Sequence, residues 1–526
     1  MKYNNPILPG FYPDPSICRA GEDYYLVTSS FEYFPGVPLF HSRDLVHWEQ
    51  IGHCLTRRSQ LEIVKGFPSV SGIFAPTIRF HNNRFYMITT NKALGTKGGG
   101  NFFVYTDDIY GEWSDPVWID HKGIDPSLFF DDDGKVYYTG AWKGIYQCEI
   151  DIETGKRLNE TRLIWSGSGG CAAEGPHLYK INGVYYLLIA EGGTSYGHMV
   201  TIARSKNPYG PFEECERNPI LTHSGKKSPI QATGHADMIQ AHNGSWWAIC
   251  LGIRPVPFPD AHHLGRETFL TPVKWADDGW PIFGDNGMLL PEMEAECLLP
   301  VIFPEKPARD NFDSDKLDLQ WNFIRNPNVE DWSLSEKKGF LTLHGSERTL
   351  EDHGSPAFIG RRLQHFNCHI STLLEFDPVN DGNEAGLTMF LNGEMASVKN
   401  GGHHYEIALT RINNKKSIIF RRRIGSIWMI DKTAEYSGNT VVLGIEASYR
   451  IFSFYYMAQC GKPVKIGEGE THYLSSETGG GFTGLYTGMY ATGNGKRLTA
   501  PANFDWFEYL PVEDPGLISY WDYIKC

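Results

Sequence analysis

The N-terminal part of the chain repeats one pattern of apolar and polar positions. A short apolar segment is followed by a polar turn and then by an apolar segment rich in aromatic residues. The five copies begin at Asp14, Ala75, Asp125, Glu174 and His235. Their turns read AGED, HNNR, DDDG, INGV and HNGS, which is the chemistry of β-hairpins. The copies recur every ~50–60 residues, a period typical of propeller blades.

Further strand-like segments follow each copy, so that each unit offers about four strands, as a propeller blade does. We therefore predict an all-β chain in which residues 1–305 form a five-bladed β-propeller. The alternative is a generic β-sandwich, which does not account for the five self-similar units.

The remainder of the chain, residues 306–526, has a different pattern. The proline-bearing stretch LPVIFPEKPARDNFD reads as a linker before it. Period-two strand patterns follow, without a long amphipathic helix. They are FLTLHG, HISTLLEFDP, GLTMFLNG, HHYEIALTR, SIIFRRR, VVLGIEASYRIFSFYYM and NFDWFEYLP. This pattern predicts a second domain, a β-sandwich of jelly-roll type.

The register of the repeat brings candidate chemistry to one place. In a propeller the first strand of each blade lines the central axis, so the five equivalent positions converge on one pit. Three of them are carboxylates, Asp14, Asp125 and Glu174, and the sequence places Glu174 and His235 one residue farther from the apolar part of their strands. Like charges in a buried pit raise at least one pKa. Carboxyl groups of different protonation are what glycoside hydrolysis requires.

Each acid also has a plainer interpretation when it is taken alone. An Asp before proline is often a turn former, and DDDG at 131–134 reads as a solvated hairpin turn. Acidic clusters also bind calcium. EF-hand spacing is absent, so the sequence leaves room for a structural calcium ion without giving it a site. The catalytic interpretation depends on the shared register rather than on any one residue.

Composition and charge exclude several function classes. The formal net charge is −14 and no basic stripe is present, which disfavours nucleic acid as a partner. No apolar run reaches the length of a membrane span. The N-terminus MKYNNPILPG lacks the apolar core of a signal peptide, so we expect a cytoplasmic protein. The 10 cysteines form no CxxC pair, so we expect no zinc site and no required cofactor.

Several motifs, taken in chain order, make the whole chain similar to glycoside hydrolase family 43, and most to its two-domain β-xylosidases and α-L-arabinofuranosidases. They are NPILPGFYPDPSI, GIFAPTIRF, GIDPSLFFDDDGKVYY, AAEGPHLYK, GHADMI, LGRETF and FTGLYTGMYATG. The resemblance implies that Asp14 is the general base and Glu174 the general acid. Asp125 would orient the acid and keep its pKa raised. The implied reaction is inverting, with acid and base roughly 6.5–9.5 Å apart.

The same resemblance implies substrate contacts. Arg266 in LGRETF would hold substrate hydroxyls with its fixed donors. His235 in GHADMI would lie near the base of the pocket, with bracing of the propeller axis as its alternative. Phe31, Phe74 and Trp142 would form apolar walls around the sugar. Many relatives have Trp at the position of Phe74, which leaves the shape of this subsite open.

The second domain is expected to reach the same pocket. Its loop GGGFTG would place Phe482 over the mouth as a lid, closing one end of the site and favouring exo-action. The competing interpretation is a carbohydrate-binding module that acts at a distance from the catalytic site.

We therefore expect an inverting exo-glycosidase that removes terminal non-reducing β-1,4-linked xylose from xylo-oligosaccharides. An α-L-arabinofuranosidase, or an enzyme with both activities, is the alternative within the class, because the two sugars place similar hydroxyls in similar positions. A non-catalytic sugar-binding propeller is the alternative from another class, and it predicts neutral residues where the three acids stand. The expected partners are a xylo-oligosaccharide or an arabinose-bearing oligosaccharide and, as in relatives, further copies of the chain.

Overall fold

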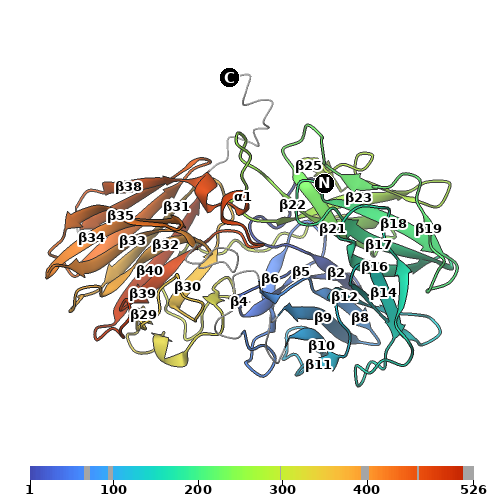
Figure 1. The fold of residues 1–526 in the computed structure, drawn as a ribbon, viewed down its shortest axis with the longest axis horizontal. Coiled ribbons are helices and arrows are strands. Elements are labelled where there is room, and N and C mark those ends of the chain that lie inside the picture. The colour runs from blue at the N-terminus through green and yellow to red at the C-terminus, as the bar shows by residue number, and fades with distance from the viewer. Residues whose placement is uncertain (64–70, 93–98, 296–297, 393–401, 459–460, 513–526) are drawn as a thin grey trace.

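The computed structural model describes residues 1–63, 71–92, 99–295, 298–392, 402–458 and 461–512. Regular structure in this part of the chain is almost entirely β-strand, as predicted. The exceptions are α1 (Ser476–Gly479) and two 3-10 helices, η1 (Val329–Asp331) and η2 (Thr471–Leu474). No helix among these residues is long and apolar enough to cross a membrane. Figure 1 shows two halves side by side, with the N-terminal half on the right.

Residues 16–283 form five antiparallel sheets in chain order, each built from one consecutive stretch of the chain. The first contains β2 (Ser16–Ala20), β3 (Asp23–Val27), β5 (Gly36–Ser42) and β6 (Glu49–Leu55). The second contains β7 (Gly72–Ile73), β8 (Thr77–His81), β9 (Arg84–Lys92), β10 (Gly100–Thr106) and β11 (Val117–Ile119). The third contains β12 (Ile124–Phe130), β13 (Val136–Ala141), β14 (Ile145–Glu149) and β15 (Arg162–Trp165).

The remaining two sheets complete the N-terminal half. The fourth contains β16 (Glu174–Ile181), β17 (Val184–Glu191), β18 (Met199–Ser205), β19 (Glu213–Glu214) and β20 (Leu221–Thr222). The fifth contains β21 (Gln231–Gln240), β22 (Trp246–Ile253), β23 (Glu267–Trp275) and β24 (Pro281–Phe283). Beside them, β1 (Lys2–Asn4) pairs with β25 (Glu292–Glu294). Strands β2, β8, β12, β16 and β21 contact one another in turn, and β21 also contacts β2, so these inner strands close into a ring.

Most of the hairpin turns have the conformation that their sequences predict. Asn82 and Asn83 join β8 to β9 with φ of 49° and 59°, the left-handed conformation that a tight hairpin turn requires. The turn DDDG is solvated at Asp132, Asp133 and Gly134, as expected, whereas Asp131 is buried. Lys180 Nζ and Tyr185 Oη donate to the two carboxylate oxygens of Asp131 at 2.6 and 2.5 Å.

A buried carboxylate ties the inner strands together. Asp237 on β21 accepts hydrogen bonds from Ser16 Oγ at 2.7 Å, Arg79 Nη1 at 2.9 Å and Tyr179 Oη at 2.6 Å. Those partners lie on β2, β8 and β16. Burial raises the pKa of Asp237, but the nearby charges of Arg79 and His177 outweigh it and hold the pKa below its usual range. This paired ion is a structural centre for the ring.

The C-terminal half consists of two sheets with a hydrophobic core between them. One sheet has the order β28 (Trp332–Ser333), β29 (Leu341–Leu343), β40 (Ala502–Pro511), β31 (Cys368–Glu375), β36 (Thr440–Ala447), β37 (Ile451–Ala458) and β38 (Val464–Glu470), and β26 (Arg309–Asp310) also pairs with β40. The other has the order β30 (Ala357–Arg362), β39 (Tyr486–Thr492), β32 (Glu384–Asn392), β33 (Gly402–Ile412), β34 (Lys415–Gly425) and β35 (Ile427–Glu435). This is the predicted β-sandwich.

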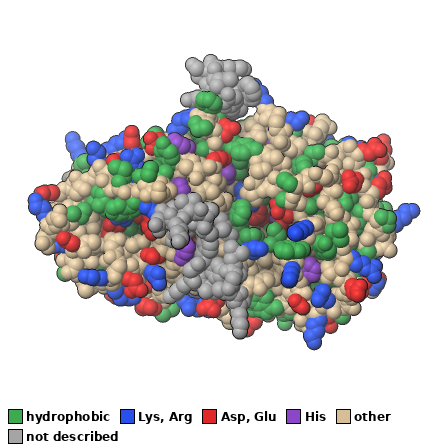
Figure 2. Space-filling view, viewed as in Figure 1, with side chains coloured by type: hydrophobic (Ala, Val, Ile, Leu, Met, Phe, Trp, Pro, Cys, Tyr) green, Lys and Arg blue, Asp and Glu red, His purple; other side chains and the backbone are tan. Residues whose placement is uncertain are grey.

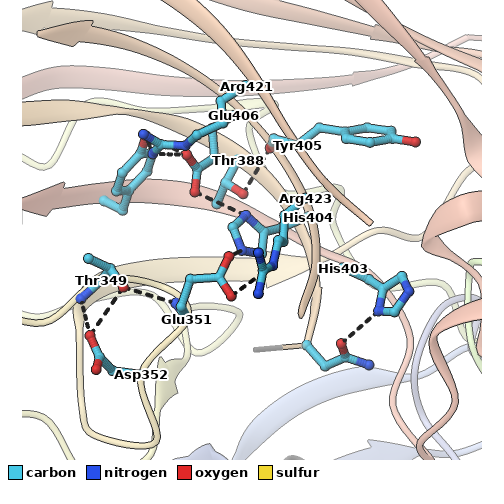
Figure 3. Close-up of polar contacts among 12 residues, drawn as sticks. Thr349, Glu351, Asp352, Thr388, His403, His404, Tyr405, Glu406, Arg421 and Arg423 are labelled. Carbon is cyan, nitrogen blue, oxygen red and sulfur yellow. Dashed lines mark hydrogen bonds and ion pairs between the residues drawn. The ribbon is translucent and has the colours of Figure 1, made fainter. Parts of the chain in front are cut away.

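The outer side of the second sheet carries a buried network of charges (Figure 3). Arg421 pairs with Glu384 and with Glu406, while His404 lies 2.8 Å from Glu351 and 3.0 Å from Glu406. Arg423 pairs with Glu351 at 3.1 Å. The network contains three carboxylates, Glu351, Glu384 and Glu406, and three cationic side chains, His404, Arg421 and Arg423.

The pKa values in this network follow from that pairing. Burial raises the pKa of Glu406, but Arg421 and His404 outweigh it and lower the pKa to about 2. Burial lowers the pKa of His404, but Glu351 and Glu406 raise it to about 9. Glu406 and His404 are therefore both ionised near neutral pH.

The two halves are joined by backbone pairing and by aromatic packing. β4 (Tyr33–Phe34) pairs with β27 (Phe323–Ile324), and the rings of Tyr33 and Tyr486 stack at 3.7 Å between centroids. Arg362 Nε also donates to the Phe11 carbonyl at 2.6 Å. On the face in Figure 2, Lys and Arg are interspersed with Asp and Glu rather than gathered in one stripe.

Candidate active site

The five register positions of the repeat line one pocket at an end of the inner ring. The pocket is lined by Asp14, Phe31, Phe74, Ala75, Ile124, Asp125, Glu174, Thr194, His198, His235, Arg266 and Phe482. Phe482 is contributed by the C-terminal half, between α1 and β39. Residues more than 460 positions apart in the sequence (Asp14 and Phe482) therefore meet at one site.

The backbone explains how these side chains are aimed. Asp14, Asp125 and His235 share a left-handed conformation, with φ of 53°, 52° and 50°. In the fourth sheet Gly175 takes this conformation, with φ of 57°, so Glu174 precedes the shared position by one residue. The expected offset is therefore right for Glu174 and wrong for His235. Gly175 is required here, because a Cβ would lie 2.9 Å from the His235 ring.

Asp14 is a buried carboxylate with strong donors on both oxygens. Arg266 Nη1 donates to Oδ1 at 2.7 Å, and Ser29 Oγ donates to Oδ2. His235 Nδ1 lies 3.8 Å from Oδ1. Burial raises the pKa of Asp14, but Arg266, His235 and Ser29 outweigh it, so the net pKa is lowered. Asp14 is thus held ionised.

Asp125 and Glu174 are buried acids with the opposite behaviour. Burial and the charges of Glu174 and Asp14 raise the pKa of Asp125 well above its usual range. Burial and the charge of Asp14 raise the pKa of Glu174 to about 7, against a smaller lowering by Arg266. The Gly175 amide donates to Asp125 Oδ2 at 3.2 Å, which fixes the chain beside Glu174. The pair therefore retains a proton near neutral pH.

Arg266 connects the acids to an aromatic wall. Its Nη2 donates to the Phe482 carbonyl at 3.2 Å, and its guanidinium lies 5.6 Å from the centre of the Phe31 ring. The rings of Phe31, Phe74 and Phe482 pack mutually, with centroids 5.2 to 6.1 Å apart. A charged donor beside apolar rings suits a ligand with both hydroxyl groups and a flat apolar face.

Two buried histidines complete the wall. Burial lowers the pKa of His235, and it lowers the pKa of His198 to about 3. The His198 ring is therefore neutral near neutral pH. Neither nitrogen of His198 has a hydrogen-bond partner among the described residues, so this ring has capacity for a ligand hydroxyl or a water.

Sequence reasoning and the pocket differ at a few residues. Trp142 is 49% exposed and is not among the lining side chains, so the structure does not bring it to the site. Thr194 and His198 line the pocket and Ser29 bonds Asp14, but the sequence analysis missed all three. They lie on connections between strands, and no motif marks them.

The structure gives no placement for a metal ion. Among the described residues, no group of three or more His, Cys, Asp and Glu side chains has the arrangement of a metal site. A structural calcium ion stays a prediction without an assigned site.

Comparison with known proteins covers both halves of the chain. Residues 3–281 match the model of glycosyl hydrolases family 43, and residues 309–510 match the model described as a beta xylosidase C-terminal Concanavalin A-like domain. The chain is 44% identical to a non-reducing end alpha-L-arabinofuranosidase of Bacteroides ovatus, over 96% of this chain and 94% of that one. It is 34% identical to a beta-xylosidase of Bacillus subtilis, over 97% and 99%.

A solved structure gives the same picture. The structure of a xylan beta-1,4-xylosidase from Bacillus halodurans superposes with a TM-score of 0.89 at 34% identity and covers 97% of this chain and 100% of that one.

Proposed function

Since the chain belongs to glycosyl hydrolases family 43, we propose that this glycoside hydrolase is an inverting exo-enzyme that removes one terminal pentose from the non-reducing end of an oligosaccharide. We also infer that the five sheets are the blades of a five-bladed β-propeller spanning residues 1–305, followed by a sandwich over 306–526. The closed ring of inner strands supports the blades. The observation that carries the function is the set of three buried acids with opposite pKa shifts in one pocket.

The proposed reaction uses two of the acids directly. Glu174 donates its proton to the glycosidic oxygen as the bond to the anomeric carbon breaks. Asp14 takes a proton from the water that attacks that carbon from the opposite face. We assign Asp125 to orienting Glu174, through the hydrogen bond that it accepts from the adjacent Gly175 amide. The ionised state of Asp14 and the raised pKa of Glu174 match these two roles.

Closure of the pocket supports exo-action. Arg266 and the rings of Phe31, Phe74 and Phe482 surround the space next to the acids. We assign Arg266 and His235 to the hydroxyls of the terminal sugar and the three rings to its apolar face. Phe482 would act as the lid. Trp142, expected as an apolar wall of the same subsite, does not line this pocket and has no part in the proposed site.

For the sugar itself we propose terminal β-1,4-linked xylose first. The sequence and structure relatives named beta-xylosidase cover both halves of the chain. The second candidate is terminal α-L-arabinofuranose, and the specific observation in its favour is the 44% identity to a protein of that activity. An enzyme with both activities is consistent with the relative named xylosidase/arabinosidase, at 39% identity.

The test is the ratio of kcat/KM on 4-nitrophenyl β-D-xylopyranoside and 4-nitrophenyl α-L-arabinofuranoside, with the product anomer followed by NMR. We expect turnover of the xyloside and first appearance of the α-anomer of xylose. Turnover of the arabinofuranoside alone would replace the sugar assignment. Retained configuration would overturn the roles of Asp14 and Glu174, and turnover of neither substrate would favour a sugar-binding protein.

A further inference from the structure

A carboxylate of the sandwich reaches two loops of the N-terminal half close to the pocket. Glu477 of α1 accepts hydrogen bonds on Oε1 from Tyr196 Oη at 2.8 Å and from His262 Nδ1 at 2.7 Å. Its Oε2 accepts from the His262 backbone amide at 2.9 Å. Burial raises the pKa of Glu477, but the bonds and charge of His262 outweigh it and lower the pKa to about 2. The carboxylate is therefore ionised and held by three donors.

The position of this group relates it to the lid. Phe482 follows Glu477 by five residues, across Gly480 and Gly481, whose φ values are 68° and 84°. Both ends of the lid segment bond to the segment that leads to Arg266: the Ser476 amide donates to the His262 carbonyl at 3.5 Å, and the Leu485 amide donates to the His263 carbonyl at 3.0 Å.

The backbones also approach closely at this point. A Cβ on Gly265 would lie 2.8 Å from the Cα of Gly484, and one on Gly484 would lie 2.4 Å from the Leu264 carbonyl oxygen. The segment carrying Phe482 and the segment carrying Arg266 are thus packed without any side chain between them, so a movement of one is transmitted to the other.

A second cavity lies behind the lid. Its volume is about 200 Å³, and Tyr196, His262 and Glu477 are in its wall. It shares Thr194, His198, Arg266 and Phe482 with the pocket of the three acids. Arg266 and Phe482 therefore belong to the partition between the two spaces, and Glu477 fixes that partition from the side of the cavity.

We propose that Tyr196, His262 and Glu477 form a latch that holds Phe482 closed and thereby sets the exo-specificity of the enzyme. These are positioning residues, and they act on the substrate through the lid. With the latch intact, the space next to the acids ends at Phe482 and takes one terminal sugar. With the latch broken, the lid moves and the cavity behind it receives a second sugar, so cleavage one unit farther into the chain becomes accessible. This inference rests on the proposed exo-glycosidase function.

The test uses the full chain and a 4-nitrophenyl β-xylobioside, or the corresponding arabinosyl disaccharide if the substrate ratio favours arabinose. An exo-enzyme removes the terminal sugar first, so nitrophenol appears after a lag. We expect Glu477→Ala to release the intact disaccharide and nitrophenol directly, without the lag. On the aryl monosaccharide we expect KM to rise about tenfold with kcat changed less, the pattern of lost binding in a site whose wall has loosened.

Two further variants separate the latch from a general loss of stability. Tyr196→Phe removes one hydrogen bond with little change of shape and should shift the product ratio in the same direction by a smaller amount. Glu336→Gln is the matched control, since Glu336 accepts from His344 Nε2 at 2.6 Å within the sandwich and is not in the wall of either cavity. It should retain the wild-type lag.

The outcomes distinguish this inference from the function on which it rests. A folded Glu477→Ala protein with the wild-type lag, products and KM would overturn the latch. A wild-type enzyme that lacks the lag, or that hydrolyses no aryl glycoside, would instead overturn exo-action or the proposed function.

Discussion

Two clusters of three carboxylates among the described residues, one in the sandwich and one in the pocket, differ in the number of cations around them. In the sandwich, Glu351, Glu384 and Glu406 lie among His404, Arg421 and Arg423 (Figure 3). The pKa of Glu406 is lowered there to about 2.

In the pocket, Asp14, Asp125 and Glu174 have one arginine, Arg266, and its bond goes to Asp14. The pKa of Glu174 is consequently raised to about 7. Burial is similar in the two clusters, so it does not tell a structural acid from a reactive one. The two clusters are distinguished by the number of cations near the carboxylates, which is smaller in the pocket.

The largest effect is expected from removing the one pocket acid that is fully paired. Asp14→Asn leaves the shape but provides no base for water. We expect kcat/KM to fall on every substrate by more than the ~10²–10⁴-fold usual for acid–base groups. Aryl-glycoside kinetics measure this, with Asp132→Asn in an exposed hairpin turn as the control. Rescue by azide through a covalent intermediate would contradict inversion.

Glu174→Gln should have a smaller effect that depends on the leaving group. We expect a loss of ~10²–10⁴-fold on xylobiose and much less on an aryl glycoside, whose leaving oxygen needs little protonation. Because the acid must be protonated, wild-type activity should fall as pH rises through about 7, the raised pKa of Glu174. The variant should lack this alkaline limb. Equal losses on both substrates would remove Glu174 from the acid role.

Substitutions in the sandwich cluster should change the stability of the fold and leave the catalytic rate unchanged. Arg421→Met leaves Glu384 and Glu406 buried without their main partner, so we expect unfolding to be easier by ~3–5 kcal/mol. The kcat/KM of the folded protein should stay at the wild-type value. Lys415→Met, which breaks an exposed pair with Glu435 of the neighbouring strand β35, should lower stability much less, because exposed ion pairs contribute little. Equal losses of stability in the two variants, measured by urea denaturation, would contradict a structural role of the buried cluster, and a fall of kcat/KM in the folded Arg421→Met protein would contradict its separation from the chemistry.

The sequence predicted the positions of site residues well where they belong to the repeated units, because the repeat fixes their geometry. Equivalent positions in similar units must converge, so Asp14, Asp125 and Glu174 were found without knowledge of any contact, and the pocket contains all three. The error at His235 arose because the apolar run of its strand is shifted, whereas its backbone conformation matches that of Asp14. Local hydrophobicity does not report φ.

Features made by non-repeated segments were harder to predict. The stretch VVLGIEASYRIFSFYYM reads as one strand but forms β36 and β37 around a turn. Strand β35 has mostly exposed side chains, so it has no alternation to detect. Glu477, Tyr196 and His262 lie far apart in sequence and carry no motif, and the proposed latch depends on their tertiary contacts.

The contact between Gly265 and Gly484 limits how such a molecule can be rebuilt. Backbone packs directly against backbone at this contact. A side chain at either position would therefore push apart the N-terminal half and the sandwich segment that carries Phe482. A sandwich domain taken from another protein would therefore need a glycine at the position of Gly484 before its loop could pack against the N-terminal half.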